Sequence, residues 1–126
     1  TDFLIRTRHI DPSIPMILWQ IGVIGYMNAP KAGMSSPGIK ILIEQLAKIY
    51  GEDHDVLIYE AARYPNHSPL IQQLALSAVS KARISPVSTM FIPNRLLPEI
   101  DENMVDRLGL SIDDFRILKY SSGRKR

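Results

Sequence analysis

Apolar and polar residues follow two different periods along this chain, and the change between them predicts the order of its elements. Residues 14–22 (IPMILWQIG) are apolar at nearly every position, which is typical of a central strand that is buried on both faces. Between residues 39 and 50 the apolar positions recur at spacings of three and four, which predicts an amphipathic helix. Residues 56–60, 70–76 and 87–92 predict three further strands.

Caps and turn residues mark where these elements begin and end. Residues 25–38 are rich in Gly, Pro, Ser and Asn and therefore predict a loop, and Ser36-Pro37 at its end indicates a helix start. Gly51 stands where a left-handed residue commonly stops a helix. Near the C-terminus, Asp101 is expected to cap a helix over residues 101–108, and Ser111-Ile-Asp-Asp114 resembles a second capping box.

A strand, a loop, a helix and further strands in this order predict an α/β fold. We expect a small mixed sheet of about four or five strands flanked by helices, with a short helical piece at residues 77–81. With 126 residues and 45% hydrophobic content, the chain has the size of one compact domain. We assign this domain to residues 1–120 and expect residues 121–126 to be a disordered basic tail.

The composition of the chain bears on three questions: whether it binds nucleic acid, whether it crosses a membrane, and in which compartment it resides. A net charge of only +2, with acidic and basic residues interspersed, argues against a nucleic-acid partner. No apolar run approaches the roughly 20 residues that cross a bilayer, so we expect no membrane span. The absence of cysteine fits a reducing, cytoplasmic location. Because the chain begins with Thr1 rather than Met, its start is either a processing site or a boundary of the sequence, and we expect a boundary.

Residue types that commonly perform acid, base or metal chemistry do not form a recognisable motif here. His9, His54 and His67 lack the neighbours in sequence that nucleophilic catalysis or a metal site requires, and a solvated turn histidine is the simpler reading of His54. The glycines form neither a dinucleotide fingerprint nor a phosphate loop. We therefore predict no catalytic residue and no metal ligand on this chain.

The ends of the predicted strands carry the more informative residues, because ligands of open α/β sheets gather beyond the carboxyl ends of strands. Trp19-Gln20 ends the first strand, Glu60-Ala61-Ala62 follows the second, and Ser88-Thr89 lies in the last. Small alanines let a flat ring approach the backbone, and Gln20 and Thr89 offer uncharged hydrogen-bonding groups. The alternative is purely structural, with tight packing at the alanines and at Trp19, and a satisfied polar pair of Gln20 and Thr89.

Three motifs in order, 16–22 (MILWQIG), 56–65 (VLIYEAARYP) and 85–93 (SPVSTMFIP), resemble the C-terminal half of the tetrapyrrole methylase class. Within that class they are similar to the borosin-type peptide backbone N-methyltransferases, which have a Leu-Trp-Gln strand, a Tyr-Glu-Ala turn and a Ser-Thr-Leu strand ending in Ile-Pro. The resemblance covers roughly residues 10 to 115. Gln20 departs from the Tyr-Met-Gly common in tetrapyrrole members, which favours the peptide-modifying branch.

The resemblance implies a two-domain methyltransferase that holds S-adenosylmethionine between its halves. It places Tyr59, Ala61 and Ala62 at the adenine pocket, Gln20 at a cofactor contact, and Thr89 near the adenine or ribose. It also implies that a missing N-terminal half carries the catalytic residues, that the enzyme is a homodimer, and that the methyl acceptor is a peptide or a small molecule. The alternatives are half of a tetrapyrrole C-methyltransferase, or a non-catalytic interaction module that retains the half-fold.

Overall fold

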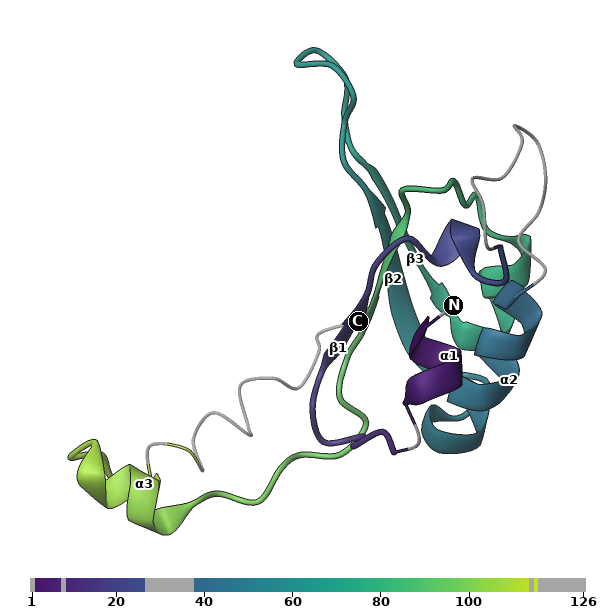
Figure 1. The fold of residues 1–126 in the computed structure, drawn as a ribbon. Helices are drawn as coiled ribbons and strands as arrows, with labels where there is room; N and C mark the ends of the chain where they lie inside the picture. The colour runs from purple at the N-terminus through teal and green to yellow at the C-terminus, as the bar shows by residue number, and fades with distance from the viewer. Residues whose placement is uncertain (1, 8, 27–37, 114, 116–126) are drawn as a thin grey trace.

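The computed structural model describes residues 2–7, 9–26, 38–113 and 115 of the chain (Figure 1). Its helices are α1 (Asp2–Arg6), α2 (Gly38–Tyr50) and α3 (Glu102–Arg107), and its two 3-10 helices are η1 (Ile21–Val23) and η2 (Leu76–Lys81). Its strands are β1 (Met16–Leu18), β2 (Asp55–Glu60), β3 (Leu70–Ala75) and β4 (Thr89–Ile92). None of the helices within these residues combines the length and the apolar character that crossing a bilayer requires.

The four strands form one sheet in the order β1-β4-β2-β3. This confirms the predicted α/β class with a small sheet and flanking helices, although all three pairings are antiparallel where a mixed sheet was expected. Strand β2 lies at the centre, where Tyr59 stands opposite Ile71 of β3 on one side and Thr89 of β4 on the other. Side chains directly opposite in a sheet share a face, so Tyr59, Ile71 and Thr89 project to the same side.

One face of the sheet forms the hydrophobic core. Four inward side chains of the strands, Val56, Ile58, Met90 and Ile92, are at most 1% exposed and pack with the apolar stripe of α2. Helices α1, α2 and η2 all lie on this side (Figure 1). The predicted helix over residues 39–50 and the helical piece at 77–81 are therefore confirmed, and each uses its apolar positions to cover the sheet.

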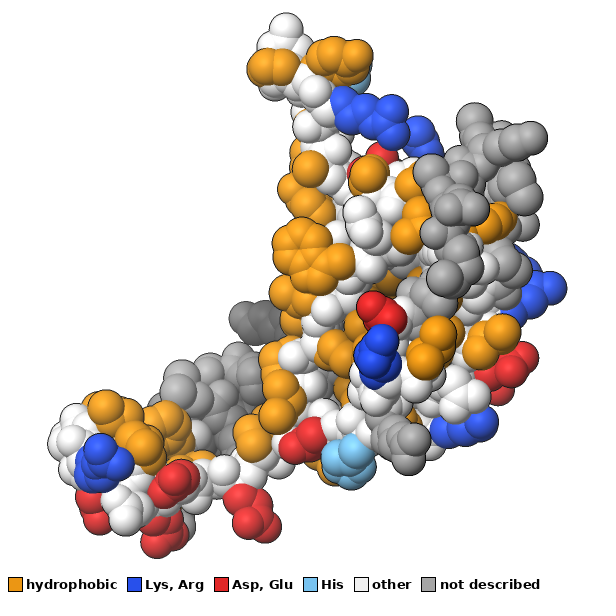
Figure 2. All heavy atoms as spheres, viewed as in Figure 1, with side chains coloured by type: hydrophobic (Ala, Val, Ile, Leu, Met, Phe, Trp, Pro, Cys, Tyr) orange, Lys and Arg blue, Asp and Glu red, His pale blue; other side chains and the backbone are white. Residues whose placement is uncertain are grey.

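The other face of the sheet is uncovered by the described residues, and we call it the open face. Four large hydrophobic side chains on it are solvent-exposed: Ile17 is 54% exposed, Tyr59 41%, Ile71 58% and Phe91 37%. Figure 2 shows hydrophobic side chains following one another along the sheet. Exposed apolar side chains grouped in this way are typical of a surface that packs against another protein segment.

Strand β1 corrects one prediction. Residues 14–22 were expected to form a central strand buried on both faces, but β1 has only three residues, pairs with β4 alone and lies at the edge of the sheet. Its alternating apolar side chains divide between the core, which takes Leu18, and the open face, which takes Ile17. An uncovered apolar face thus produces the same sequence pattern as a doubly buried strand.

The predicted helix boundaries can be followed at two places. Gly51 has a φ of 88° and ends α2 in the left-handed conformation, and the Asp101 carboxylate accepts a hydrogen bond of 3.0 Å from the Met104 N–H at the start of α3. Helix α3 stands apart from the sheet at the end of an extended segment (Figure 1). The Ser36-Pro37 start, most of the 25–38 loop and the tail 121–126 lie outside the described residues, as does Asp114 of the second capping box.

Candidate functional site

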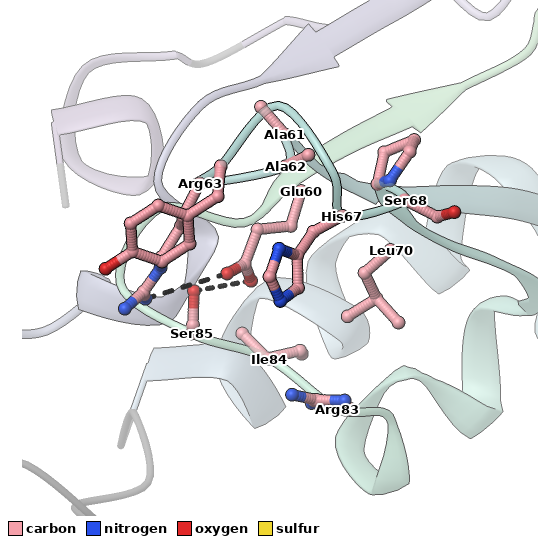
Figure 3. Close-up of a pocket in the computed structure, with 12 residues that line it drawn as sticks. Glu60, Ala61, Ala62, Arg63, His67, Ser68, Leu70, Arg83, Ile84 and Ser85 are labelled. Carbon is pink, nitrogen blue, oxygen red and sulfur yellow. Dashed lines mark hydrogen bonds and ion pairs between the residues drawn. The ribbon is translucent and has the colours of Figure 1, made fainter.

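Strands β2 and β3 continue beyond the sheet as a long hairpin whose tip, residues 61–69, is exposed (Figure 1). Between the base of this hairpin and the segment 83–85 lies a cavity of about 560 Å³ (Figure 3). Its walls comprise Glu60, Ala61, Ala62, Arg63, Tyr64, His67, Ser68, Pro69, Leu70, Arg83, Ile84 and Ser85. The volume lies within the range of about 300–1,000 Å³ that is usual for small-molecule sites.

The carboxylate of Glu60 organises one side of this cavity. Its Oε2 atom accepts a hydrogen bond of 2.6 Å from the Ser85 hydroxyl and one of 3.2 Å from the Ser88 hydroxyl. Figure 3 shows the Glu60 side chain directed toward Ser85 and Arg63. The Glu60 side chain is only 15% exposed, so these hydroxyls replace much of the water that a carboxylate otherwise binds.

Arg63 adds a weaker interaction at the same carboxylate. Its guanidinium lies 3.8 Å from Oε1 of Glu60, and the Arg63 side chain is 71% exposed. Exposed ion pairs of this kind contribute about 0–1 kcal/mol, because solvent screens them and the long side chain loses entropy. The serine hydroxyls therefore matter more than Arg63 for the placement of Glu60.

Residues 85–88 form a turn that is held by the same two serines, and we call it the 85–88 turn. The Ser88 hydroxyl accepts a hydrogen bond of 2.8 Å from the Ser85 N–H, and the Ser85 hydroxyl accepts one of 3.3 Å from the Val87 N–H. The Ser88 N–H donates to the Ser85 carbonyl at 3.1 Å. Ser88 is fully buried, so its polar groups depend on these partners.

The chain leaves β1 through a sharp corner that abuts the 85–88 turn. Gln20 has φ 53° and ψ 45°, the one positive φ among the described non-glycine residues, and its side chain is exposed. The next residue, Ile21, donates its N–H to the Ser88 carbonyl at 3.0 Å. Gly22 packs so tightly that a Cβ atom there would lie 2.1 Å from the Ser85 carbonyl oxygen.

The five residues predicted to bind a cofactor fall into three places. Ala61 and Ala62 are exposed and line the cavity. Tyr59 and Thr89 are opposite partners on β2 and β4 and project to the open face, not into the cavity. Gln20 lies at the β1 corner and is connected through Ile21 to Ser88, the residue before Thr89. The structure thus brings the three strand-end motifs to one end of the sheet, and their assigned roles stay a prediction.

Three polar residues at this end of the sheet carry interactions that the sequence reasoning did not assign to a site. Glu60, Ser85 and Ser88 belong to the quoted motifs, but which of their neighbours they bind depends on the pairing of β2 with β4. A glutamate at the end of an apolar strand, on the same face as the buried Val56 and Ile58, was the available signal.

Two of the histidines, His54 and His67, make structural contacts. Nε2 of His54 lies 2.9 Å from the Pro93 carbonyl oxygen, and because a carbonyl only accepts, this nitrogen carries the hydrogen and donates it. The ring of His67 lies against Tyr64 with a centroid separation of 5.5 Å. Across the described segments, no three His, Cys, Asp or Glu side chains are grouped as metal ligands would be.

Comparison with known proteins finds similarity over nearly the whole chain. No protein-family model matches. The chain is 32% identical over 122 residues to the methyltransferase/ribosomally synthesized type III borosin cyclic peptide precursor of Anomoporia bombycina. It is 34% identical over 118 residues to the gymnopeptides precursor of Gymnopus fusipes, and 30% identical over 115 residues to the omphalotin A precursor of Omphalotus olearius, both also named as methyltransferase/cyclic peptide precursors.

These matches cover 94%, 90% and 87% of this chain but only 14%, 28% and 27% of the three relatives. The chain therefore spans less than a third of the length of each relative. Identity near 30% over most of the chain shows common descent of this region. The chain is thus homologous to one segment of borosin-type methyltransferase/cyclic peptide precursor proteins.

Proposed function

We propose that this chain is the C-terminal half of an S-adenosylmethionine-dependent methyltransferase, forms one wall of the cofactor cleft, and serves peptide backbone N-methylation. The observation that carries this proposal is the similarity, over about nine tenths of the chain, to proteins whose names join a methyltransferase to a ribosomally synthesized cyclic peptide precursor. Those names favour a peptide acceptor over a tetrapyrrole. A cytoplasmic location belongs to the same proposal, since the chain has no cysteine.

The residues at the strand ends fit S-adenosylmethionine. The cavity beside Ala61 and Ala62 has room for a ligand of that size, and the small side chains leave the backbone within reach of a flat base. Arg63, Arg83 and the Ser85 hydroxyl add polar groups to the wall. When bound, this cofactor supplies an electrophilic methyl group, so the protein's task is mainly to position donor and acceptor.

Under this proposal the chain binds and orients rather than transfers protons. Gln20 presents an uncharged amide and Thr89 a hydroxyl, which can hydrogen-bond the sugar or the base without changing charge. Tyr59 lies beside Thr89 on the open face and neither lines the cavity, so a ligand that touches them would extend from the cavity past the strand ends to that face. Catalytic groups are assigned to the N-terminal half of the enzyme, outside this chain.

The open face supplies the surface on which such a half would dock. Four large hydrophobic side chains on it are between 37% and 58% exposed, which is costly for a surface that stays in water. The relatives are several times longer than this chain, so they contain sequence that could form the second half. We propose that the N-terminal half covers the open face and that the assembled enzyme is a homodimer.

The test is calorimetric titration of S-adenosylhomocysteine into the full-length protein, with Ala61→Trp as the variant. A tryptophan at position 61 would fill the cavity, so we expect at least a tenfold loss of affinity. Ser77→Trp is the matched control, because Ser77 is exposed on η2 and does not line the cavity. Equal affinity in both variants would contradict the assignment of the pocket.

A second candidate function is a non-catalytic interaction module, and the exposed open face is the observation that favours it. Such a module would bind a partner through the open face and would bind no S-adenosylhomocysteine. Titration of the wild-type protein separates the two functions. Saturable binding supports the methyltransferase, whereas a protein that assembles through the open face without binding the ligand supports the module.

A further inference from the structure

We propose that Glu60 is a positioning residue for the ligand site, because its carboxylate holds the 85–88 turn and the turn in turn holds the corner that carries Gln20. The ligand in this inference rests on the proposed function. The hydrogen bonds that connect Glu60 through Ser85 and Ser88 to Ile21, which we call the relay, rest on the structure of the chain alone. The ligand assignment and the relay can therefore fail separately.

The direction of each hydrogen bond in the relay is determined by its partners. A serine hydroxyl has one hydrogen to donate, and both Ser85 and Ser88 already use their oxygens to accept backbone N–H groups of the turn. Their hydrogens are therefore free to point at Oε2 of Glu60, which lies 2.6 and 3.2 Å away. The site requires an acceptor at Oε2 that can take two donors, as a carboxylate or an amide oxygen can.

The 85–88 turn contacts the backbone of the β1 corner at two places, so holding the turn also holds the corner. The Ser88 carbonyl accepts the Ile21 N–H at 3.0 Å, and the Ser85 carbonyl lies against Gly22. Between these contacts and β1 stands Gln20 in the left-handed conformation. Non-glycine residues remain in that conformation only where their surroundings over-determine it, and the 85–88 turn provides such surroundings.

The arrangement joins three strand ends that are far apart in sequence. Glu60 ends β2 and precedes the cavity residues Ala61 and Ala62, Ser88 precedes β4, and Gln20 follows β1. Without the carboxylate, two buried or half-buried hydroxyls lose their acceptor, and the turn is free to adopt other conformations. Gln20 would then lose its orientation although it does not touch Glu60 itself.

The experiment compares Glu60→Ala with Glu60→Gln in the full-length protein. Glutamine keeps an acceptor oxygen for the two serines and gives up only the weak interaction with Arg63, so it should restore the relay. We expect Glu60→Ala to weaken S-adenosylhomocysteine binding by roughly tenfold and to speed amide exchange at Ile21 and Ser85 by a similar factor, with Glu60→Gln within about threefold of wild type. Glu44→Ala, an exposed carboxylate removed from α2, is the control.

Two outcomes decide the inference, and a third decides the proposed function. Faster exchange at Ile21 in Glu60→Ala, with unchanged exchange at Leu46 in the core and rescue by Glu60→Gln, supports it. Unchanged exchange at Ile21 and Ser85 in a folded Glu60→Ala protein overturns it, even if the wild-type protein binds the ligand. If the wild-type protein binds no S-adenosylhomocysteine, the proposed function fails, and the exchange rates alone still decide whether the relay exists.

Discussion

At the scale of single residues, two features are energetically unfavourable by themselves: the left-handed backbone of Gln20 and the largely buried carboxylate of Glu60. Gln20 occupies a conformation that costs an L-residue roughly 1 kcal/mol or more. Glu60 places a carboxylate where only 15% of its side chain is exposed. Both lie at the end of the sheet where the predicted ligand residues gather, and strained or desolvated groups of this kind are concentrated at functional sites.

Gln20→Gly separates stability from binding. Glycine adopts positive φ without steric cost, so the variant should gain roughly 0.5 kcal/mol in free energy of unfolding, measured by urea denaturation. If the Gln20 amide contacts the ligand, affinity for S-adenosylhomocysteine should fall by several-fold. Gln45→Gly in the exposed part of α2 is the control and should instead lose about 1 kcal/mol with affinity unchanged. A stabilised variant with full affinity would remove Gln20 from the site.

The burial of Tyr50 predicts that the stability of the fold depends on pH. Its side chain is 3% exposed, its hydroxyl has no hydrogen-bond partner among the described residues, and burial raises the pKa of the phenol above its ordinary value. Because the pKa of Tyr50 is higher in the folded state than in the unfolded chain, the free energy of unfolding keeps its full value below about pH 10. It then falls as the pH rises through the folded-state pKa.

Tyr50→Phe should therefore flatten the loss of stability above pH 10. At pH 7 it should raise the free energy of unfolding by roughly 1 kcal/mol, because it removes a buried hydroxyl without a partner. Denaturant unfolding followed by circular dichroism at pH 7 and pH 10.5 measures both effects. Tyr64→Phe is the control, since Tyr64 is 66% exposed. A variant that is less stable at both pH values would show that the hydroxyl is satisfied in solution.

At the scale of secondary-structure elements, the helices differ in what stabilises them. Helix α2 packs its apolar stripe on the sheet, so tertiary contacts support it. Helix α3 has six residues and stands apart from the sheet, so it depends on local interactions such as the Asp101 cap (Figure 1). Removing a local interaction should thus affect one helix and leave the other unchanged.

Asp101→Ala tests this difference. Loss of an N-cap costs about 1 kcal/mol of helix stability, and a helix of six residues has little in reserve. We expect amide exchange at Met104 and Val105 to accelerate by roughly fivefold, while the midpoint of global thermal unfolding changes by less than about 1 °C. A fall of several degrees would mean that α3 packs on the domain. Asp53→Ala, in an exposed turn, is the control.

At the scale of the whole molecule, the sheet is covered on one face and bare on the other. The apolar positions of β2 and β4 therefore have two uses: one set forms the core, and the other faces outward. The proposed N-terminal half and the proposed second copy both require a surface of this kind, and so does the alternative interaction module. Disruption of the open face should consequently change assembly more than folding.

Ile71→Lys should release such an assembly without unfolding the domain. Ile71 is 58% exposed, so the free energy of unfolding of the isolated domain should change by less than about 1 kcal/mol. Light scattering coupled to size-exclusion chromatography of the full-length protein should show a lower mass or a larger hydrodynamic radius. Ile41→Lys, at a residue that is 52% exposed on α2, is the matched control. Equal masses for both variants and wild type would place the partner surface elsewhere.

Much of the fold could be predicted from local patterns, whereas the site could be predicted only in part. The period of α2, the stop at Gly51 and the cap at Asp101 depend on neighbours in sequence, so the pattern alone located them. The same reasoning placed residues 14–22 in the centre of the sheet and missed α1, because neither the edge position of β1 nor the packing of α1 is encoded in a local period. The strand-end motifs come together at one end of the sheet, but the sequence did not show which of their residues touch, and their role in binding stays a prediction.

The sequence by itself determined the α/β class, the positions of α2 and of strands β2 to β4, and the similarity that motivates the methyltransferase proposal. Each of these depends on residue order or on spacing within a few positions. Only the tertiary structure decided that Glu60 meets Ser85 and Ser88, that Ile21 joins the 85–88 turn, and that one apolar face stays bare. The Glu60 contacts depend on the antiparallel pairing of β2 with β4, and the Ile21 contact depends on that of β1 with β4; the register of such pairings is not encoded in a local period.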